Sequence, residues 1–178
     1  MKLLLTGAPR SGKSSLIRRL AEASTGAAGI ITVERRGADH RRIGFDLLAV
    51  YCRPGRPLQV IQEAPLARLA HPSGLRVGRY GVEPGALELA VHALDAAMHE
   101  GSLVLIDEIG PLQICSPAFR EAVDRCLDSR CSLLGSLSTQ EDPYLAAIRR
   151  RPGVRVLEVT PQNRAHLAEG LTGWLRQG

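Results

Sequence analysis

The residues with the clearest chemical potential lie close to the N-terminus. In residues 7–14, Gly7 and Gly12 are separated by four residues, and a lysine and a serine follow directly. This is the pattern G-x-x-x-x-G-K-[ST], whose glycines let successive backbone N–H groups point inward around an anion. An apolar run, residues 3–5, precedes it and helical spacing follows it, which is the strand–loop–helix context that the pattern requires. The sequence therefore predicts a loop that binds nucleotide phosphates.

The polar residues of this loop have distinct expected roles. Lys13 should reach the β- and γ-phosphates, and Ser14 should offer its hydroxyl to Mg²⁺, which takes few protein ligands. All but two of the 23 basic side chains are arginines, so a lysine here indicates that the loop needs a compact ammonium. We predict nucleotide contacts for Gly7, Ala8, Pro9, Arg10, Ser11, Gly12, Lys13, Ser14 and Ser15.

Two adjacent carboxylates, Asp107 and Glu108, end a second informative segment. They follow the aliphatic residues 103–106, as expected where a buried parallel strand ends, and ligands bind at that end of such strands. Asp107 is predicted to complete the Mg²⁺ site opposite Ser14. The predicted second nucleotide segment comprises Leu103, Val104, Leu105, Ile106, Asp107, Glu108, Ile109 and Gly110.

Glu108 is the candidate that orients or deprotonates the attacking water. Because neighbouring strand residues point to opposite faces, it reaches the site with Asp107 only if the chain turns, and Gly110-Pro111 supplies a turn. An ordinary glutamate, with a pKa of about 4.3, is a weak base, so we expect orientation to matter more than proton transfer. The alternative is an acidic strand end that faces solvent.

Three further residues have two interpretations each. Arg79 lies in a glycine-flanked loop and is a candidate catalytic residue that stabilises charge in the transition state, but a surface arginine is the alternative. Ser138 and Thr139 follow an apolar strand, where they would either sense the γ-phosphate or cap the loop.

The rest of the chain alternates between strand and helix patterns. Residues 29–33, 43–50, 103–106, 132–137 and 154–159 read as strands, the first two joined by a hairpin, and residues 53–84 read as loops with short strands. A helix is predicted over 86–100, and three more begin at the pairs Ser116-Pro117, Asp142-Pro143 and Thr160-Pro161. The alternation predicts an α/β fold with a mostly parallel central sheet flanked by helices on both faces. The length predicts a single domain, residues 1–178.

Composition and charge limit the partners. The net charge is +5, but the arginines are dispersed and aromatic residues make up only 3%, so a solvated basic face is favoured over a nucleic-acid surface. No run approaches the ~20 apolar residues of a membrane span. The four cysteines show no metal-binding spacing and fit reduced thiols in the cytoplasm. We expect a cytoplasmic monomer whose partner is a nucleoside triphosphate.

Several residue blocks together with the loop resemble the cancer-related nucleoside-triphosphatase family. The blocks are residues 29–34, 42–46, 76–82, 104–110, 142–144 and 159–164, and the likeness covers nearly the full length. The resemblance implies a P-loop fold of the additional-strand, catalytic-glutamate type and slow, Mg²⁺-dependent hydrolysis of ATP, GTP and other nucleoside triphosphates. The family's two nucleotide segments fall on residues 7–14 and 103–110. Arg10 departs from the family's usual glycine, and Arg79 from a common lysine.

Three functions therefore compete. A nucleoside-triphosphatase with broad base specificity is preferred, since the chain lacks the Asn-Lys-x-Asp stretch with which many GTPases read guanine. A small-molecule or nucleoside kinase on the same fold would need an acceptor pocket. A regulatory adapter that binds nucleotide, with possible RNA association, is the third. Phosphate release without an acceptor separates the first from the other two.

Overall fold

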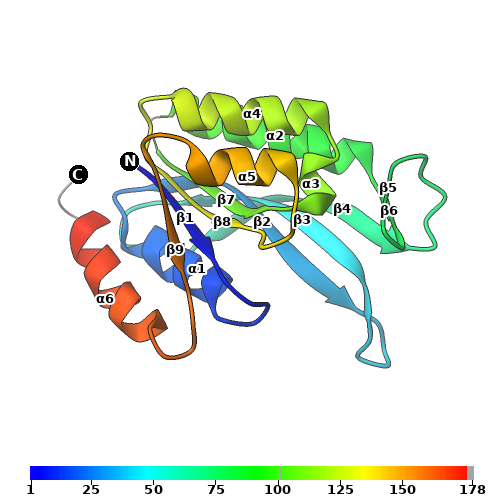
Figure 1. Cartoon of the computed structure of the whole chain (residues 1–178), viewed down its shortest axis with the longest axis horizontal. Coiled ribbons are helices and arrows are strands. Elements are labelled where there is room, and N and C mark those ends of the chain that lie inside the picture. The colour runs from blue at the N-terminus through cyan, green and yellow to red at the C-terminus, as the bar shows by residue number, and fades with distance from the viewer. Residues whose placement is uncertain (101, 176–178) are drawn as a thin grey trace.

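The computed structural model describes residues 1–100 and 102–175 of the chain. The strands are β1 (Lys2–Thr6), β2 (Ala27–Arg36), β3 (Arg42–Cys52), β4 (Gln59–Leu69), β5 (Arg76–Val77), β6 (Tyr80–Val82), β7 (Leu103–Ile109), β8 (Leu133–Leu137) and β9 (Val154–Glu158). The helices are α1 (Lys13–Ala23), α2 (Pro84–His99), α3 (Pro111–Ile114), α4 (Pro117–Asp128), α5 (Pro143–Arg150) and α6 (Arg164–Leu175). All these strands belong to one sheet, in the order β5-β6-β4-β3-β2-β7-β8-β1-β9 (Figure 1).

The sheet has a parallel half and an antiparallel half. Strands β2, β7, β8, β1 and β9 run parallel, as the alternation of strands and helices predicts. Strands β3, β4, β6 and β5 extend the sheet in antiparallel fashion. Here the chain returns through short connections and needs no crossover helix. The carboxyl ends of the parallel strands meet at one edge, and both predicted nucleotide segments lead to it.

Strand β8 lies between the strand that precedes the phosphate loop and the strand that carries the carboxylates. The order β7-β8-β1 separates β7 from β1 by one strand. This is the additional-strand arrangement that the family resemblance implies, and it is confirmed. The residues of β8 are therefore placed between the two predicted halves of the site.

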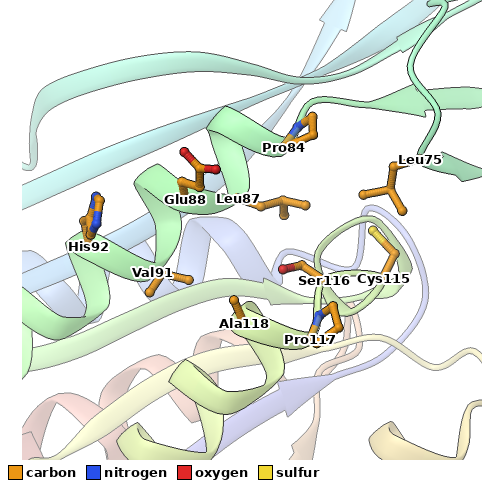
Figure 2. A pocket seen from close by; sticks show the side chains of 10 residues that line it. All are labelled: Leu75, Pro84, Leu87, Glu88, Val91, His92, Cys115, Ser116, Pro117 and Ala118. Carbon is orange, nitrogen blue, oxygen red and sulfur yellow. The ribbon is translucent and has the colours of Figure 1, made fainter.

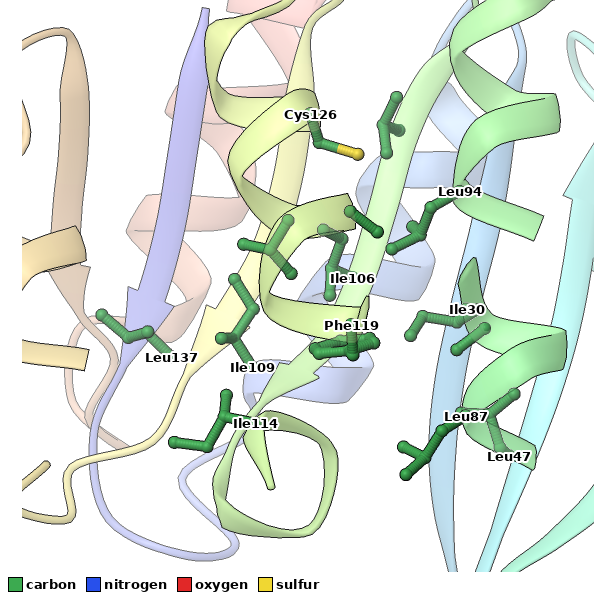
Figure 3. Packing of buried hydrophobic residues seen from close by; sticks show 14 of the residues in the cluster. Ile30, Leu47, Leu87, Leu94, Ile106, Ile109, Ile114, Phe119, Cys126 and Leu137 are labelled. Atoms are coloured by element: carbon green, nitrogen blue, oxygen red, sulfur yellow. The ribbon is translucent and has the colours of Figure 1, made fainter. Parts of the chain in front are cut away.

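Helices cover both faces of the sheet, as predicted. Helices α2, α3, α4 and α5 lie on one face, and α1 and α6 lie side by side on the other (Figure 1). Figure 3 shows the first core, where Phe119 of α4 packs near Ile106 and Ile30 of the sheet. Successive residues of β7 alternate between the two cores, which explains its uninterrupted apolar run. None of the described helices has the length and apolar content to cross a membrane.

Residues 53–84 depart from the prediction of loops with short strands. They contain β4, an 11-residue strand. Its first half pairs only with β3, since β6 joins it only at residues 67–69, and residues 59–63 are exposed. An exposed strand with one hydrogen-bonded neighbour needs no apolar face, so it lacks the alternating pattern by which strands are recognised.

The serine–proline and aspartate–proline pairs mark helix starts as predicted. Ser116 Oγ accepts a hydrogen bond from the Phe119 N–H (3.2 Å), and Asp142 Oδ1 accepts one from the Tyr144 N–H (2.8 Å). Two boundaries differ from the prediction. Helix α2 begins at Pro84, two residues early, with proline again in its first turn. Helix α6 begins at Arg164, several residues after Thr160, because residues 160–163 form a separate turn.

Candidate active site

The loop between β1 and α1 has the backbone of an anion cradle. Gly7, Arg10 and Gly12 have positive φ angles of 131°, 65° and 104°. A Cβ at Gly7 would lie 2.4 Å from the carbonyl oxygen of Val159, so this position requires glycine. Gly12 is the N-cap of α1, and no side chain of the described residues caps the helix. The N–H groups of its first turn are therefore available to an anion.

Arg10, the departure from the family pattern, occupies a left-handed backbone position. Such a conformation costs a non-glycine residue about 1–2 kcal/mol, whereas glycine adopts it freely. The conformation explains why glycine suits this position. The Arg10 side chain is exposed, so it leaves the cradle open.

Lys13 lies across the loop. Its Nζ donates hydrogen bonds to the carbonyl oxygens of Gly7 (2.8 Å) and Ala8 (3.0 Å). Ser11 Oγ is buried in the loop and has no hydrogen-bond partner among the described residues. The cradle thus holds a fixed ammonium and an unused hydroxyl, both suited to phosphate oxygens.

Asp107 lies buried at the end of β7, with 4% of its surface exposed. Its Oδ1 accepts a hydrogen bond from the Ser136 hydroxyl of β8. Its Oδ2 has no partner within residues 1–100 and 102–175, although the Ser14 hydroxyl lies nearby. Burial raises the pKa of Asp107, against the opposing effects of Ser136, Ser14 and Lys13.

A buried carboxylate oxygen without a partner, beside a hydroxyl, fits a small divalent cation. Such a cation would balance the negative charge that burial disfavours, and Mg²⁺ would keep most of its coordination positions for water and phosphate. Ser14 and Asp107, the predicted ligands, are therefore the residues that would hold it.

Glu108 reaches the same edge through an irregularity in the strand. Ile106 pairs with Gly135, but Ile109 pairs with Leu137, so β7 advances three residues where β8 advances two. Such a bulge re-aims side chains. The predicted turn at Gly110-Pro111 is thus not needed to bring both carboxylates to one site, because the bulge lies before it.

The surroundings of Glu108 change its basicity. Burial raises the pKa of Glu108, and the negative charge of Asp107 raises it further, while the nearby Lys13 opposes both effects. Glu108 is therefore more basic than the ordinary glutamate assumed from sequence. Its charge interactions with Asp107 and Lys13 place all three side chains around one site.

Arg79 and Glu108 line one pocket of about 430 Å³. The Arg79 guanidinium lies over the Tyr80 ring, with its Cζ 5.5 Å from the ring centroid, and Nη2 donates to Tyr80 Oη (3.4 Å). Arg42 lines the same pocket and donates from Nε to the same hydroxyl (3.0 Å). The structure thus brings the predicted Arg79 and Glu108 together and adds a second arginine.

The chain is similar to known proteins over nearly its full length. A family model described as NTPase matches residues 2–172. The chain is 35% identical over 177 residues to nucleoside-triphosphatase THEP1 of Thermotoga sp. (strain RQ2), covering 99% of this chain and 96% of the relative. The chain belongs to this NTPase family.

Two solved structures of the NTPase family have the same fold. The crystal structure of THEP1 from Aquifex aeolicus superimposes with a TM-score of 0.82 at 28% identity, covering 98% of this chain and 99% of that one. The solution structure of a human cancer-related nucleoside triphosphatase gives 0.74 at 27% identity, covering 99% and 98%. These matches confirm the family that the sequence resembles and its α/β P-loop fold.

Within this NTPase, most side chains of the second predicted nucleotide segment, residues 103–110, are buried. The side chains of residues 103–106 and Ile109 are buried in the two cores, with at most 7% of their surface exposed. They position the carboxylates from within the cores, and their contact with a nucleotide stays a prediction. Ser138 has a structural role, because its Oγ accepts the Gln140 N–H (3.3 Å) and its N–H donates to the Ile109 carbonyl (3.0 Å). This favours loop capping over phosphate sensing for Ser138.

Sequence reasoning missed Ser136, Arg42 and Gln140 as residues of the site. Ser136 is the one hydroxyl within the apolar strand β8, and this isolated polar residue is a signal that would have found it. Arg42 and Gln140 line the pocket with Glu108. Each is an exposed residue of an ordinary type, and only the fold brings them together.

A separate apolar pocket of about 320 Å³ lies between α2 and the start of α4 (Figure 2). Leu87 and Val91 face Pro117 across it. It lies among the helices on the sheet face opposite α1 and holds none of the predicted site residues (Figure 1). The predicted phosphate loop and carboxylates therefore lie outside this pocket.

Proposed function

We propose that this protein hydrolyses nucleoside triphosphates to the diphosphate and phosphate in an Mg²⁺-dependent reaction. The observation that carries the proposal is Oδ2 of buried Asp107, which lies beside Ser14 of the phosphate loop and next to Glu108 and has no hydrogen-bond partner among the residues that the structure describes. The names of the relatives, nucleoside-triphosphatases from bacteria and archaea, support the same reaction.

The residues divide the work of the reaction among them. The N–H groups of the loop and Lys13 hold the β- and γ-phosphates. Ser14 and Asp107 would hold Mg²⁺, which would supply positive charge to the phosphate oxygens. Glu108 accepts a hydrogen bond from the attacking water, aims its oxygen at the γ-phosphorus and takes its proton. Burial, the largest cause of the raised pKa of Glu108, makes this proton transfer more favourable than for an ordinary glutamate. Arg79 offers its charge to the terminal phosphate as the bond to the leaving diphosphate breaks.

The phosphate loop is tested by Lys13→Ala, which removes the ammonium from the cradle. Phosphate release from ATP should fall by about 10²–10³, the effect of losing one preorganised electrostatic contact. The assay is run with Mg²⁺ and again with EDTA, which should abolish release by the wild-type protein. Near-normal turnover in the variant would show that this loop is not the phosphate site.

Broad base specificity is part of the proposal. A site without a buried polar group that demands one base edge discriminates weakly between bases. Competition between ATP, GTP, CTP and UTP should show preferences below roughly a hundredfold, or about 2.7 kcal/mol. A stronger preference for one base would contradict this part of the proposal.

A kinase is the second candidate function, because the pocket beside Glu108 has room for an acceptor molecule. Arg42 and Arg79 would attract an anionic acceptor into its 430 Å³. An assay without an acceptor separates the two functions, because a kinase then releases little phosphate from ATP. We favour hydrolysis because the relatives are named for it.

The cytoplasm is the compartment we propose. Cys52, Cys115, Cys126 and Cys131 are all free thiols, which fits a reducing environment. We also propose that the protein acts as a monomer and a single domain without a nucleic-acid partner, as the sequence predicts.

A further inference from the structure

The strand order fixes the direction in which a bound nucleotide must lie. Strands β7 and β9 lie on opposite sides of β1, the strand that leads into the phosphate loop. The γ-phosphate has to lie toward the end of β7, because Asp107 and Glu108 are there. The nucleoside at the other end of the triphosphate therefore extends toward the end of β9 and the start of α6.

A cleft of about 240 Å³ lies at that place, between α1 and α6. Gly12 and Ser15 of the phosphate loop and its helix form one wall, so the cleft continues directly from the cradle. Leu16 and Ala168 form a buried apolar floor, with 5% and 3% of their surfaces exposed. An apolar floor beside a phosphate cradle suits a flat heterocyclic ring.

Arg164 is fixed at the opposite wall of this cleft. A reciprocal turn precedes it, in which Asn163 Oδ1 accepts the Thr160 N–H (2.9 Å) and Thr160 Oγ1 accepts the Asn163 N–H (3.2 Å). Asn163 Nδ2 also donates to the Glu158 carbonyl (2.9 Å). The Arg164 side chain runs alongside the loop, since a Cβ on Gly12 would lie 3.3 Å from Arg164 Cδ.

The charges of this cleft have no ion-pair partners in the described part of the chain. Arg164 and Arg19, the two cations of its lining, form no ion pair within residues 1–100 and 102–175. Among the described residues, Ser15 supplies the only other polar side chain of the lining. Asn163 is held by the backbone of its own turn, so the lining has no carboxylate or amide free to read the edge of a base.

We propose that this cleft binds the nucleoside half of the triphosphate, with the Arg164 guanidinium against the face of the base. The proposal rests on the function proposed above and names the residue that holds the base. A planar guanidinium stacks on any heterocyclic ring, since every base has a π-face. Broad base specificity then follows from the lining itself, and Arg19 contributes charge at the rim.

The test compares a nucleotide with a ligand that has three phosphates but no nucleoside. Binding of a non-hydrolysable ATP analogue and of inorganic triphosphate is measured by calorimetry, with Mg²⁺, for the wild type and Arg164→Ala. The analogue should bind roughly 3- to 30-fold more weakly to the variant, the range for a cation on an aromatic face. Inorganic triphosphate should bind equally to both. Arg164→Lys, which keeps the charge without the planar face, should recover little of the lost affinity.

The matched control is Arg130→Ala, since Arg130 is an exposed arginine in the connection between α4 and β8. It should bind both ligands as the wild type does. An equal loss of both ligands in Arg164→Ala would assign Arg164 to the phosphates and overturn the proposal, as would no loss of either. Lys13→Ala is measured in parallel. If Lys13→Ala binds both ligands normally, the proposed function fails as well. If Lys13→Ala loses both ligands, the phosphate site stands, and the result for Arg164→Ala tests the nucleoside site alone.

Discussion

At the scale of single residues, the site contains two groups of charges with different surroundings. Lys13 and Asp107 lie inward, where loop carbonyls and Ser136 hold them. Glu108 and Arg79 line the pocket at the outer side of the site. The inner group suits ground-state binding of a magnesium triphosphate, and the outer group suits charge and protons that move during the reaction.

Arg79→Ala should therefore lower turnover more than nucleotide binding. We expect turnover to fall by about 10², as for other groups that meet charge developing in the transition state. Affinity for a non-hydrolysable analogue should stay close to that of the wild type. Arg41→Ala, at the exposed tip of the β2–β3 hairpin, is the matched control and should change neither quantity. Equal losses of binding and turnover in Arg79→Ala would place Arg79 in the ground-state site.

The sequence predicted the residue types at the centre of the site but not their environment. The spacing of Gly7, Gly12 and Lys13 is set by the backbone conformation of one short loop, so it can be recognised in the sequence. The raised pKa of Glu108 comes from burial and from Asp107 on the same bulged strand. A bulge depends on pairing with β8, about 30 residues further along, and leaves no local pattern.

At the scale of elements, the two cores have separate functions. Helix α1, which carries Lys13 and Ser14, packs in one core with α6, while α4 packs on the opposite face of the sheet. Damage to the α4 core should lower stability without changing the geometry of the phosphate loop.

Phe119→Ala tests this separation. Phe119 is fully buried in α4, and the substitution should reduce the free energy of unfolding by about 3–5 kcal/mol, measured in urea. Nucleotide affinity, measured at a temperature where the variant is folded, should remain that of the wild type. Val60→Ala, at a side chain 54% exposed, is the control and should change stability by less than about 0.5 kcal/mol. A loss of affinity in folded Phe119→Ala would show that the two faces are coupled.

The elements that were predicted well have signals within their own residues. The caps at Ser116 and Asp142 and the apolar run of β7 are of this kind. Strand β4 was missed because its exposed first half owes its structure to pairing with β3. The start of α6 was predicted too early. Threonine is a common helix cap, but here Thr160 hydrogen-bonds with Asn163 in a turn that precedes the helix.

At the scale of the whole molecule, the strand order determines which residues meet. The antiparallel β2–β3 hairpin follows from the local sequence. The place of β8 between β1 and β7 and the pairing of β4 with β3 and β6 do not, because strand order is decided by long-range packing. Once the order is given, the carboxylates lie on one side of the loop and Arg164 on the other. In the proposed orientation, the γ-phosphate of the nucleotide lies toward the carboxylates and its nucleoside lies toward Arg164.

In the proposed reaction, Glu108 activates the water that attacks the γ-phosphate. Glu108→Gln keeps the volume and one acceptor oxygen but loses the charge and the basicity. Lys13, Ser14 and Asp107 remain, so binding of Mg²⁺–ATP should survive. Glu121→Gln, at an exposed glutamate of α4, is the control and should behave as the wild type.

The measurement is phosphate release from Mg²⁺–ATP without an acceptor, together with nucleotide binding, for the wild type and Glu108→Gln. Hydrolysis should fall by about 10² or more, the contribution of a general base, and the variant should retain intact triphosphate. If Glu108→Gln releases phosphate as fast as the wild-type protein, Glu108 is not the residue that activates water, and the account of this site is wrong.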